Sequence, residues 1–299
     1  MFRFMSYKWI YALISGIVLI PGILALLMWG LKPSLDFTGG SIAELRFANQ
    51  INRDELRDAL TQTGIETVSI QDTGSLTYLV RAKEFDKNKN EELKDALTQK
   101  FGGVDELRYE SVGPVIGKEL TVKTVTAIVI AGIAILLYIT FAFRKVTGVI
   151  LPWQFGLSAV LALIHDTLAT IGIFAILGHF FNVEVDALFV TAVLTIMSFS
   201  VHDTIVVFDR IREVLKRMTN LSIEEASNLA LTETMTRSIN NSLTIIFMLF
   251  ALLLLGGTTI RWFVFALLIG TIFGVYSSPF VATPLLNVFG KLSRKKKAS

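Results

Sequence analysis

Six long apolar segments, separated by short polar stretches and one long polar block, dominate the pattern of this 299-residue sequence. The predicted spans cover residues 10–30, 122–143, 151–177, 187–208, 237–257 and 261–285. Each reaches the length of about 20 residues that a helix needs to cross the hydrocarbon core of a bilayer. The pattern therefore predicts an α-helical membrane protein that crosses the bilayer six times.

The polar block separates the first span from the other five. We expect four parts: residues 1–30 with the first span, 31–121 as a folded domain, 122–290 as a five-helix membrane bundle, and 291–299 as a basic tail. The first apolar run is too long for a signal peptide, and no small-residue cleavage site follows it, so we expect an uncleaved anchor. The composition, 53% hydrophobic with a mean hydropathy of +0.60, agrees with this class.

The distribution of basic residues predicts the orientation. Lysine and arginine lie near the ends of the spans on one side: Arg3 and Lys8 before the first, Arg144 and Lys145 after the second, Arg210, Arg212, Lys216 and Arg217 after the fourth, and Lys291, Arg294, Lys295, Lys296 and Lys297 after the sixth. The short segment before the fourth span has Glu184 and Asp186 instead. Because basic residues mark the cytoplasmic side, both termini are expected there and the polar block outside.

The charge balance adds little beyond topology. Residues 31–121 contain 12 lysines and arginines against 16 aspartates and glutamates, although the whole chain has a formal charge of +3. The basic tail is expected to contact anionic lipid, and no patch indicates nucleic-acid binding. The chain has no cysteine, so the external domain must be stable without disulfides.

The polar block contains an internal repeat. ELRDALTQTG (55–64) and ELKDALTQKFG (92–102) each follow an Asn-x-x-Glu start, at Asn52 and Asn88, that resembles a helix-capping box. Strand-like runs surround these two helices: SIAELRFA (41–48), TVSIQ (67–71), LTYLVRA (76–82) and DELRYESV (105–112). The order β-α-β-β-α-β predicts a ferredoxin-like α+β domain with both helices on one face of an antiparallel sheet.

Polar residues inside three spans mark the candidate functional positions. Spans 3 and 4 each contain a His-Asp pair, His165 with Asp166 and His202 with Asp203. Span 5 begins with a stripe of polar residues at helical spacing: Arg237, Asn240, Asn241 and Thr244. Such a stripe must face the bundle interior or water, because lipid cannot satisfy it. Intramembrane acids are expected to lie on an ion or proton pathway.

Three other interpretations of these residues stay open. Buried charge pairs could serve only to fix the register of the helices. The two His-Asp motifs could bind a metal in an ion-coupled metal or small-molecule transporter, although adjacent helical residues point about 100° apart and helical ligands usually come at i, i+3 or i, i+4. Two carboxylates could also form an intramembrane aspartyl protease, although the nearby Arg237 would keep a carboxylate ionised.

Several sequence blocks together resemble a known family. LDFTGG (35–40) follows span 1, SVGPVIGKEL (111–120) precedes span 2, and ALIHD (162–166), VHDTIVVFDRIRE (201–213) and TRSINNSLT (236–244) lie in or beside spans 3 to 5. These blocks are similar to the signatures of the SecD/SecF family of protein-export membrane proteins, on its SecF side, within the resistance-nodulation-division superfamily. The resemblance covers nearly the whole chain, and its blocks occur in the family's order.

The resemblance implies a function and a set of partners. It implies a six-helix bundle in a bacterial inner membrane, paired with a similar SecD bundle, that uses the proton motive force to help secreted proteins cross after SecA has driven them into the SecYEG channel. It also implies YajC as an accessory partner and the secreted preprotein as the client. It implies no enzyme activity, no metal and no cofactor beyond the proton as coupling ion.

The family's functional residues fall on particular positions of this sequence. Asp203 and Arg237 match the intramembrane acid and base of the family, and Asp166 matches the acid of its third span. Asp36, with Gly39 and Gly40, matches the LDFTGG block. We expect Asp203 and Arg237 to face each other, and protonation of Asp203 to break their attraction and rearrange the helices. The family often has Asn where His202 stands, so either His202 or Asp203 could carry the proton.

Overall fold

The computed structural model describes residues 3–144 and 150–298, and it divides into two compact units. A helical unit contains residues 1–32 and 126–299, and a second unit contains Pro33–Val125. The boundary between them differs by a few residues from the one expected at residues 31–121. Lys145, one of the predicted topology residues, lies outside the described residues.

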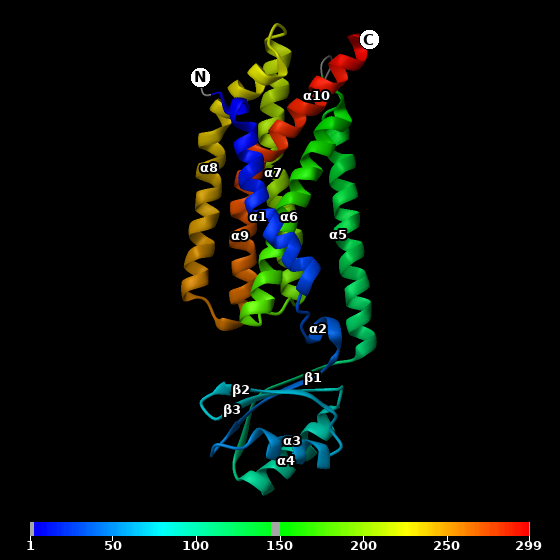
Figure 1. Cartoon of the computed structure of the whole chain (residues 1–299), viewed down its shortest axis with the longest axis vertical. Helices are drawn as coiled ribbons and strands as arrows, with labels where there is room; N and C mark the ends of the chain where they lie inside the picture. The colour runs from blue at the N-terminus through cyan, green and yellow to red at the C-terminus, as the bar shows by residue number, and fades with distance from the viewer. Residues whose placement is uncertain (1–2, 145–149, 299) are drawn as a thin grey trace. The chain divides into compact units, whose positions relative to one another are not determined.

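Among the described residues, six helical segments are long and apolar enough to cross a membrane (Figure 1). Their elements are η1 (Phe4–Tyr7) with α1 (Lys8–Trp29), α5 (Pro114–Ala142), α6 (Pro152–Phe181), α7 (Ala187–Arg217), α8 (Ile223–Leu255), and a last segment made of η2 (Thr258–Ile260), α9 (Arg261–Ser277), η3 (Ser278–Ala282) and α10 (Thr283–Ala298). Each segment overlaps one predicted span, so the number and order of the apolar helices are as expected.

Several helices extend beyond the apolar spans that predicted them, α5, α7 and α8 among them. The helix α5 begins at Pro114, eight residues before the predicted start, and α7 continues to Arg217. The helix α8 begins at Ile223, where the Ser222 Oγ accepts from the Glu225 amide and the Glu225 carboxylate accepts from the Ser222 amide. The polar residues after this capping box therefore form one unbroken helix with the fifth span.

The sixth span is not one regular helix. A π-helical turn, Ser278–Ala282, separates α9 from α10. Pro279 lies inside this turn, and a proline lacks the amide that a regular helix would use. Because π turns inside helices occur often at functional sites, this break is relevant to the polar residues beside it.

Small residues bring the helices of this unit close together. A Cβ added at Gly172 of α6 would lie 2.6 Å from the Gly22 Cα of α1, and one at Gly270 of α9 would lie 2.2 Å from Cδ1 of Ile196 on α7. Such close backbone approach is what small residues allow between membrane helices. Gly270 and Gly274 of α9 both pack against α7.

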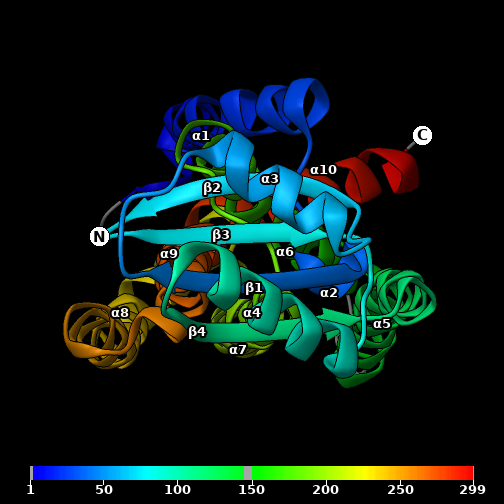
Figure 2. The same ribbon diagram turned by 90° about the horizontal axis from the view of Figure 1, so that it is seen from below.

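The arrangement of the helical unit is clear in two views. The helices α5 and α8 lie at opposite edges of the unit (Figures 1 and 2), and the start of α1 and the end of α10 lie at the same end of it (Figure 1). The latter agrees with an even number of crossings.

The second unit is an antiparallel sheet with two helices on one face (Figure 2). Its elements are α2 (Leu35–Thr38), β1 (Gly40–Phe47), α3 (Arg53–Gln62), β2 (Thr67–Gly74), β3 (Thr77–Ala82), α4 (Lys87–Phe101) and β4 (Val104–Val112). The strand order is β2-β3-β1-β4, with every neighbouring pair antiparallel. After the short α2, the predicted element order β-α-β-β-α-β is observed.

The repeated helices supply the core of this sheet unit. Leu56 and Leu60 of α3, with Leu93 and Leu97 of α4, are buried against the sheet. The first predicted cap is correct, since Asn52 accepts from the Asp54 amide at 3.0 Å. The second is wrong: Asp86 caps α4 by accepting from the Lys89 amide at 2.9 Å, so the helix begins before Asn88.

Candidate functional site

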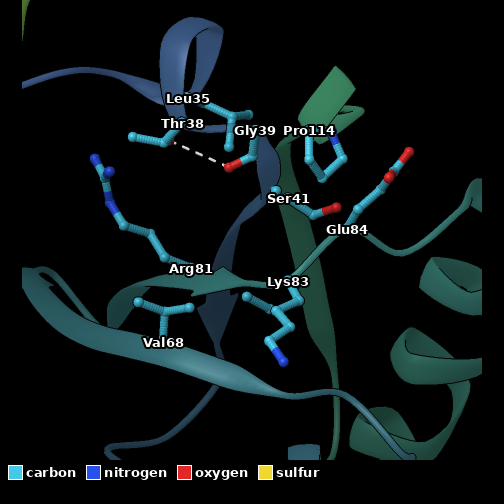
Figure 3. Close-up of a pocket in the computed structure, with 11 residues that line it drawn as sticks. Leu35, Thr38, Gly39, Ser41, Val68, Arg81, Lys83, Glu84 and Pro114 are labelled. Carbon is cyan, nitrogen blue, oxygen red and sulfur yellow. Dashed lines mark hydrogen bonds between the residues drawn. The ribbon is translucent and has the colours of Figure 1, made fainter. Parts of the chain in front are cut away.

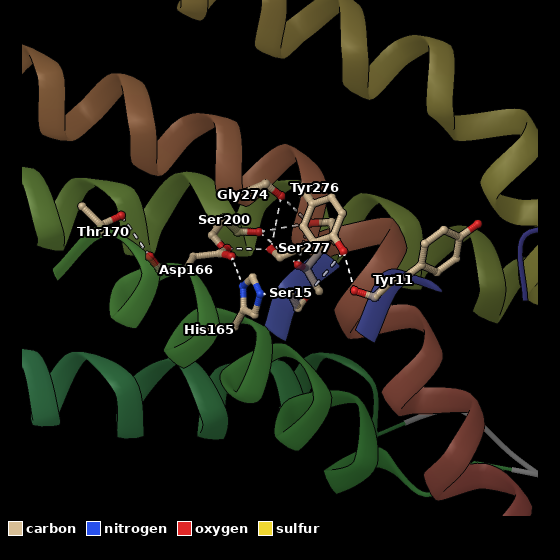
Figure 4. Close-up of polar contacts among 11 residues, drawn as sticks. Tyr11, Ser15, His165, Asp166, Thr170, Ser200, Gly274, Tyr276 and Ser277 are labelled. Carbon is tan, nitrogen blue, oxygen red and sulfur yellow. Dashed lines mark hydrogen bonds and ion pairs between the residues drawn. The ribbon is translucent and has the colours of Figure 1, made fainter. Parts of the chain in front are cut away.

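Asp166 lies at the centre of a polar cluster that joins four helices (Figure 4). Its side chain is fully buried in the middle of α6. Its Oδ2 accepts from the Ser200 Oγ of α7 and from the Ser277 Oγ of α9, each at 2.6 Å. Its Oδ1 lies 2.9 Å from the Nδ1 of His165. A carboxyl group in the membrane is costly unless it is hydrogen-bonded, and this one has partners on both oxygens.

The cluster continues from His165 to the first helix. The Nε2 of His165 lies 3.0 Å from the Ser15 Oγ of α1, which in turn lies 3.3 Å from the hydroxyl of Tyr276 on α9. The Tyr276 hydroxyl donates to the backbone oxygen of Tyr11 at 2.7 Å (Figure 4). An unbroken series of polar contacts therefore runs from Asp166 to the backbone of α1.

Small residues around Asp166 allow these helices to meet. The small residues of α6 near Asp166 are buried: Ala159, Ala162, Ala169 and Thr170. A Cβ added at Gly274 of α9 would lie 3.3 Å from the Ser200 Cα of α7. This close approach of α9 to α7 puts Ser277, one turn after Gly274, within reach of Asp166.

Asp203 occupies a second and separate polar position. Its side chain is 9% exposed, and its Oδ2 accepts from the Ser242 Oγ of α8 at 3.1 Å. Ser200, which contacts Asp166, precedes Asp203 by three residues on α7, a rise of about 4.5 Å along the helix. Asp203 and the Ser200 that donates to Asp166 therefore lie within one turn of α7, but the two acids have different hydrogen-bond partners.

Two small cavities meet at Asp203. The first, here the Asn241 cavity, has a volume of about 30 Å³, and its polar lining includes His202, Asn241, Ser242 and Thr271. The second, here the Thr234 cavity, has a volume of about 10 Å³, and its polar lining includes Thr234, Ser238 and Ser278. Each is large enough for about one water molecule and has polar groups to hold it.

The cavities lie on opposite sides of Asp203 along the bundle. On α7 the Asn241 cavity is bordered by residues 199–203 and the Thr234 cavity by residues 203–207. The lining residues of α8 and α9 are displaced in the corresponding way. In the Thr234 cavity, the buried Ser238 Oγ has no hydrogen-bond partner among the described residues. The carboxyl group of Asp203 therefore separates two polar spaces that a proton could use.

Arg237 does not pair with Asp203 in this chain, contrary to our expectation. The polar stripe of α8 is exposed, namely Arg237, Asn240, Asn241 and Thr244, and Asn241 also borders the cavity beside Asp203. Ser242 and Thr234 occupy the face that is turned toward Asp203. Within the described chain no ion pair joins Asp203 to Arg237. The physical reason is the helical period, because Arg237 and Ser242 are five residues apart and point about 140° from each other.

The two His-Asp motifs have unlike surroundings. His165 is 6% exposed and locked between Asp166 and Ser15, whereas His202 is exposed and borders the Asn241 cavity. Across residues 3–144 and 150–298, no group of three or more His, Asp or Glu side chains is arranged to hold a metal ion. The motifs thus do not converge on one set of ligands in the described structure.

The LDFTGG block forms a tight turn at the start of the sheet unit. Asp36 lies in the first turn of α2, whose N-terminal Ser34 accepts from the Asp36 amide. Gly39 has a φ of 68°, and a Cβ there would lie 2.7 Å from the Pro114 Cα. Gly40 has a φ of 115° and comes equally close to the Ala82 oxygen. Both positions require glycine, since other residues rarely adopt this backbone and would collide.

A larger cavity lies beside this turn (Figure 3). Its volume is about 670 Å³, and residues from the glycine turn and from β2 and β3 border it, among them Thr38, Ser41, Val68, Arg81, Lys83 and Glu84. The sequence blocks that resemble the family thus form part of the wall of a sizeable surface hollow on the sheet unit.

The sequence analysis did not identify the hydroxyl groups that contact the two acids, either directly or through His165 and Ser15. These are Ser15, Ser200, Ser242, Ser277 and Tyr276. Single serines are common in membrane helices, so their residue type alone gave no signal. Ser242 could have been found, since it lies within the TRSINNSLT block.

Together, the six apolar helices and the buried polar clusters define a multi-pass membrane protein with intramembrane titratable sites. Comparison with known proteins narrows the class. Residues 92–292 match the family described as "Protein export membrane protein SecD/SecF, C-terminal". The chain belongs to the SecD/SecF family.

Individual relatives agree with this assignment. The chain is 44% identical over 293 residues to "Protein translocase subunit SecF" of Thermobaculum terrenum, an alignment that covers 93% of this chain and 92% of the relative. It is 38% identical to the protein of the same name from Anaerolinea thermophila, with 97% and 94% of the two chains covered. The crystal structure of SecDF, a translocon-associated membrane protein from Thermus thermophilus, is similar with a TM-score of 0.78 and 31% identity. That comparison covers 99% of this chain but only 39% of the SecDF chain.

Proposed function

We propose that this chain acts as the SecF-type subunit of a bacterial Sec translocase, in which the proton motive force helps secreted proteins complete their passage. In this proposal SecA first drives the client into the SecYEG channel, and the chain acts with SecD afterwards, with YajC as an accessory. The names of its relatives and their near-complete coverage support a role in Sec export.

A SecD-type partner is supported by the polar stripe of α8. Arg237, Asn240, Asn241 and Thr244 are exposed on a helix that crosses the membrane, and lipid cannot satisfy such groups. The solved SecDF chain is more than twice as long as the part that matches this one. We propose that helices of SecD cover this stripe and supply a carboxylate for Arg237.

The position of Asp203 between two polar cavities is the observation that carries the proposed proton coupling. In this mechanism water in the Asn241 cavity delivers a proton to Asp203, and the Thr234 cavity receives it on release. Protonation makes Asp203 a weaker acceptor for the Ser242 hydroxyl of α8, so α7 and α8 can shift relative to each other. A charge that crosses the full membrane potential contributes about 2.3 kcal/mol per 100 mV. Asp166 and His165 accompany this site, and His202 is a candidate carrier at the mouth of the Asn241 cavity.

The sheet unit is proposed to be a ferredoxin-like domain on the outer face of the plasma membrane, with both chain termini in the cytoplasm. The basic residues near Lys8, Arg210 and Lys291 support this orientation. The domain would contact the emerging client, and the hollow beside the glycine turn offers it a surface. We propose no enzyme activity and no cofactor, because helix movement coupled to protonation requires no covalent step.

The test is Asp203→Asn in the complex with SecD, SecYEG and SecA in proteoliposomes. An amide keeps the shape of the side chain and cannot cycle its charge. We expect export to lose its dependence on the proton gradient, while the SecA-driven phase and SecD association are retained. Asp209→Asn is the matched control, since Asp209 is an exposed acid on the same helix that pairs with Arg212 at 2.5 Å. Gradient-dependent export at the normal rate in Asp203→Asn would overturn the proposal.

A further inference from the structure

The directions of the hydrogen bonds around His165 can be worked out from fixed acceptors. The backbone oxygen of Tyr11 can only accept, so the single hydroxyl hydrogen of Tyr276 is used at the 2.7 Å contact with it. The Ser15 hydroxyl, 3.3 Å from the Tyr276 oxygen, must then be the donor of that contact. With its hydrogen used there, Ser15 is left to accept from His165 at 3.0 Å. The Nε2 of His165 therefore carries a hydrogen.

The same reasoning applies to the carboxyl group. Ser200 and Ser277 both donate to Oδ2 of Asp166 at 2.6 Å, and the other acceptor within reach of Ser277, the Gly274 backbone oxygen, is farther away at 3.3 Å. A proton on Asp166 therefore belongs on Oδ1. That oxygen lies 2.9 Å from Nδ1 of His165, and a contact at this distance between two potential acceptors requires a hydrogen between them. The hydrogen is on Oδ1 next to a neutral imidazole, or on Nδ1 as an imidazolium beside a carboxylate.

We propose that His165 and Asp166 form a second proton-binding site, in which the pair holds one shared proton in addition to the hydrogen on Nε2. Either placement of that proton leaves the buried pair electrically neutral. A neutral pair is favoured at this position, because an uncompensated charge in a fully buried membrane site is costly. The site rests on the proposed proton coupling for its purpose, but its proton count follows from geometry alone.

The groups that face the pair come from all the helices packed around it. They are Ser15 and the Tyr11 backbone of α1, Ser200 of α7, and Tyr276 and Ser277 of α9. The tyrosine is the only titratable group among these described partners, and Asp203, one turn further on α7, bonds to Ser242 instead. Since no cation other than His165 contacts Asp166 in the described chain, the imidazole is its proton partner.

This arrangement makes the site sensitive to the position of α1. Ser15 is the acceptor that fixes the hydrogen on Nε2, and it comes from a helix that packs on α6 through Gly22 and Gly172. When α1 moves away from α6, Nε2 loses that acceptor, and the imidazolium form of His165 can give its Nε2 proton to a water molecule that takes the place of the Ser15 hydroxyl. Asp166 then stays ionised and accepts from Nδ1, so the pair has lost one proton. The site therefore couples α1 to the loss or uptake of one proton.

Nitrogen NMR of histidine tests the proton count directly. The chain has three histidines, so ¹⁵N-histidine labelling of this chain alone, assembled in nanodiscs with unlabelled partners, gives three imidazole spin systems. His179→Gln and His202→Gln assign the remaining signal to His165. We expect the Nε2 of His165 to be protonated at pH 7, with no exchange to the other neutral form. A bare Nε2 with a hydrogen on Nδ1 would overturn the proposal, because the pair would then have one proton fewer and a net negative charge.

Two serine variants test the role of α1 in the same spectrum. Ser15→Ala removes the acceptor, and we expect His165 to show a mixture of the two neutral tautomers. Ser15→Thr keeps a hydroxyl and should restore the single form. Ser158→Ala is the control, since the buried Ser158 hydroxyl, on α6 like His165, has no partner among the described residues. An unchanged His165 spectrum in Ser15→Ala would refute the coupling to α1. None of these readouts depends on export, so a failure of the proposed translocase function would be seen separately.

Discussion

Ser242 donates to Asp203 at 3.1 Å, and this contact identifies the face of α8 that packs against the other helices of the chain. The face that bears Ser242 and Thr234 packs on α7 and α9, and the face that bears Arg237 is exposed. A membrane helix with polar groups on both faces requires a partner on each side. The inner partner is Asp203, and in the proposed complex the outer partner comes from SecD.

Replacing Ser242 by alanine should affect the inner partner alone. Asp203 would lose its one hydroxyl donor, which we expect to lower the free energy of unfolding by roughly 1–3 kcal/mol, as for other buried acceptors left unsatisfied. The thermal midpoint of the purified chain in detergent measures this. Ser158→Ala, which removes a hydroxyl without a partner among the described residues, is the control and should change the midpoint much less. Equal effects of the two variants would show that the Ser242 contact contributes nothing.

The exposed position of Arg237 leads to a prediction on additivity. In the isolated chain, the stability losses of Asp203→Asn and Arg237→Gln should add within about 0.5 kcal/mol, since the two side chains do not contact each other. In the complex with SecD we expect Arg237→Gln to weaken association, because a partner carboxylate would be left unpaired. Thermal midpoints of both single variants and the double variant, with and without SecD, decide this. A strong interaction energy in the isolated chain would mean that Arg237 can reach Asp203 after all.

The fold could be predicted from the sequence wherever one local signal was strong. The six apolar runs and the alternation of strands and repeated helices depend on neighbouring residues, and each produced the expected elements. The errors arose where a second local signal competed with the one that was used. Asp86 caps α4 in place of Asn88, and a π turn that contains Pro279 lies where hydropathy alone predicted one continuous span.

The candidate site was predictable in its acids but not in their partners. Asp166 and Asp203 are conspicuous, because a carboxyl group inside an apolar run is rare. The facing of α8 was wrong because the polar stripe was assumed to point inward, whereas two polar faces exist on that helix. Which serine reaches which carboxyl depends on how closely the helices pack, and that is set by Gly274 on a different helix.

The contact between α1 and α6 should depend on one glycine. A Cβ at Gly172 would lie 2.6 Å from the Gly22 Cα, a separation that backbone atoms cannot relieve by rotation. We expect Gly172→Ala to separate the two helices and lower the thermal midpoint by several degrees. Gly132→Ala on α5 is the matched control, because nothing lies within 4 Å of its added Cβ, and alanine is favoured over glycine in a helix by about 1 kcal/mol. A midpoint that falls equally in both variants would contradict the role of the α1–α6 contact.

Removal of the sheet unit should separate insertion from export. Ser41 of β1 pairs with Ser111 of β4, so deletion of residues 41–109 leaves two ends that started on adjacent strands and can be joined by a short Gly-Ser linker. The six apolar helices and their flanking basic residues remain, so we expect normal insertion and SecD association. Late, gradient-dependent export should be lost, because no external domain would remain to contact the client. Protease protection of a translocating preprotein measures that phase, and an unmodified chain carrying the same linker inserted between Gly102 and Gly103 serves as the control. Normal late-phase export after the deletion would show that the membrane helices act on the client without this domain.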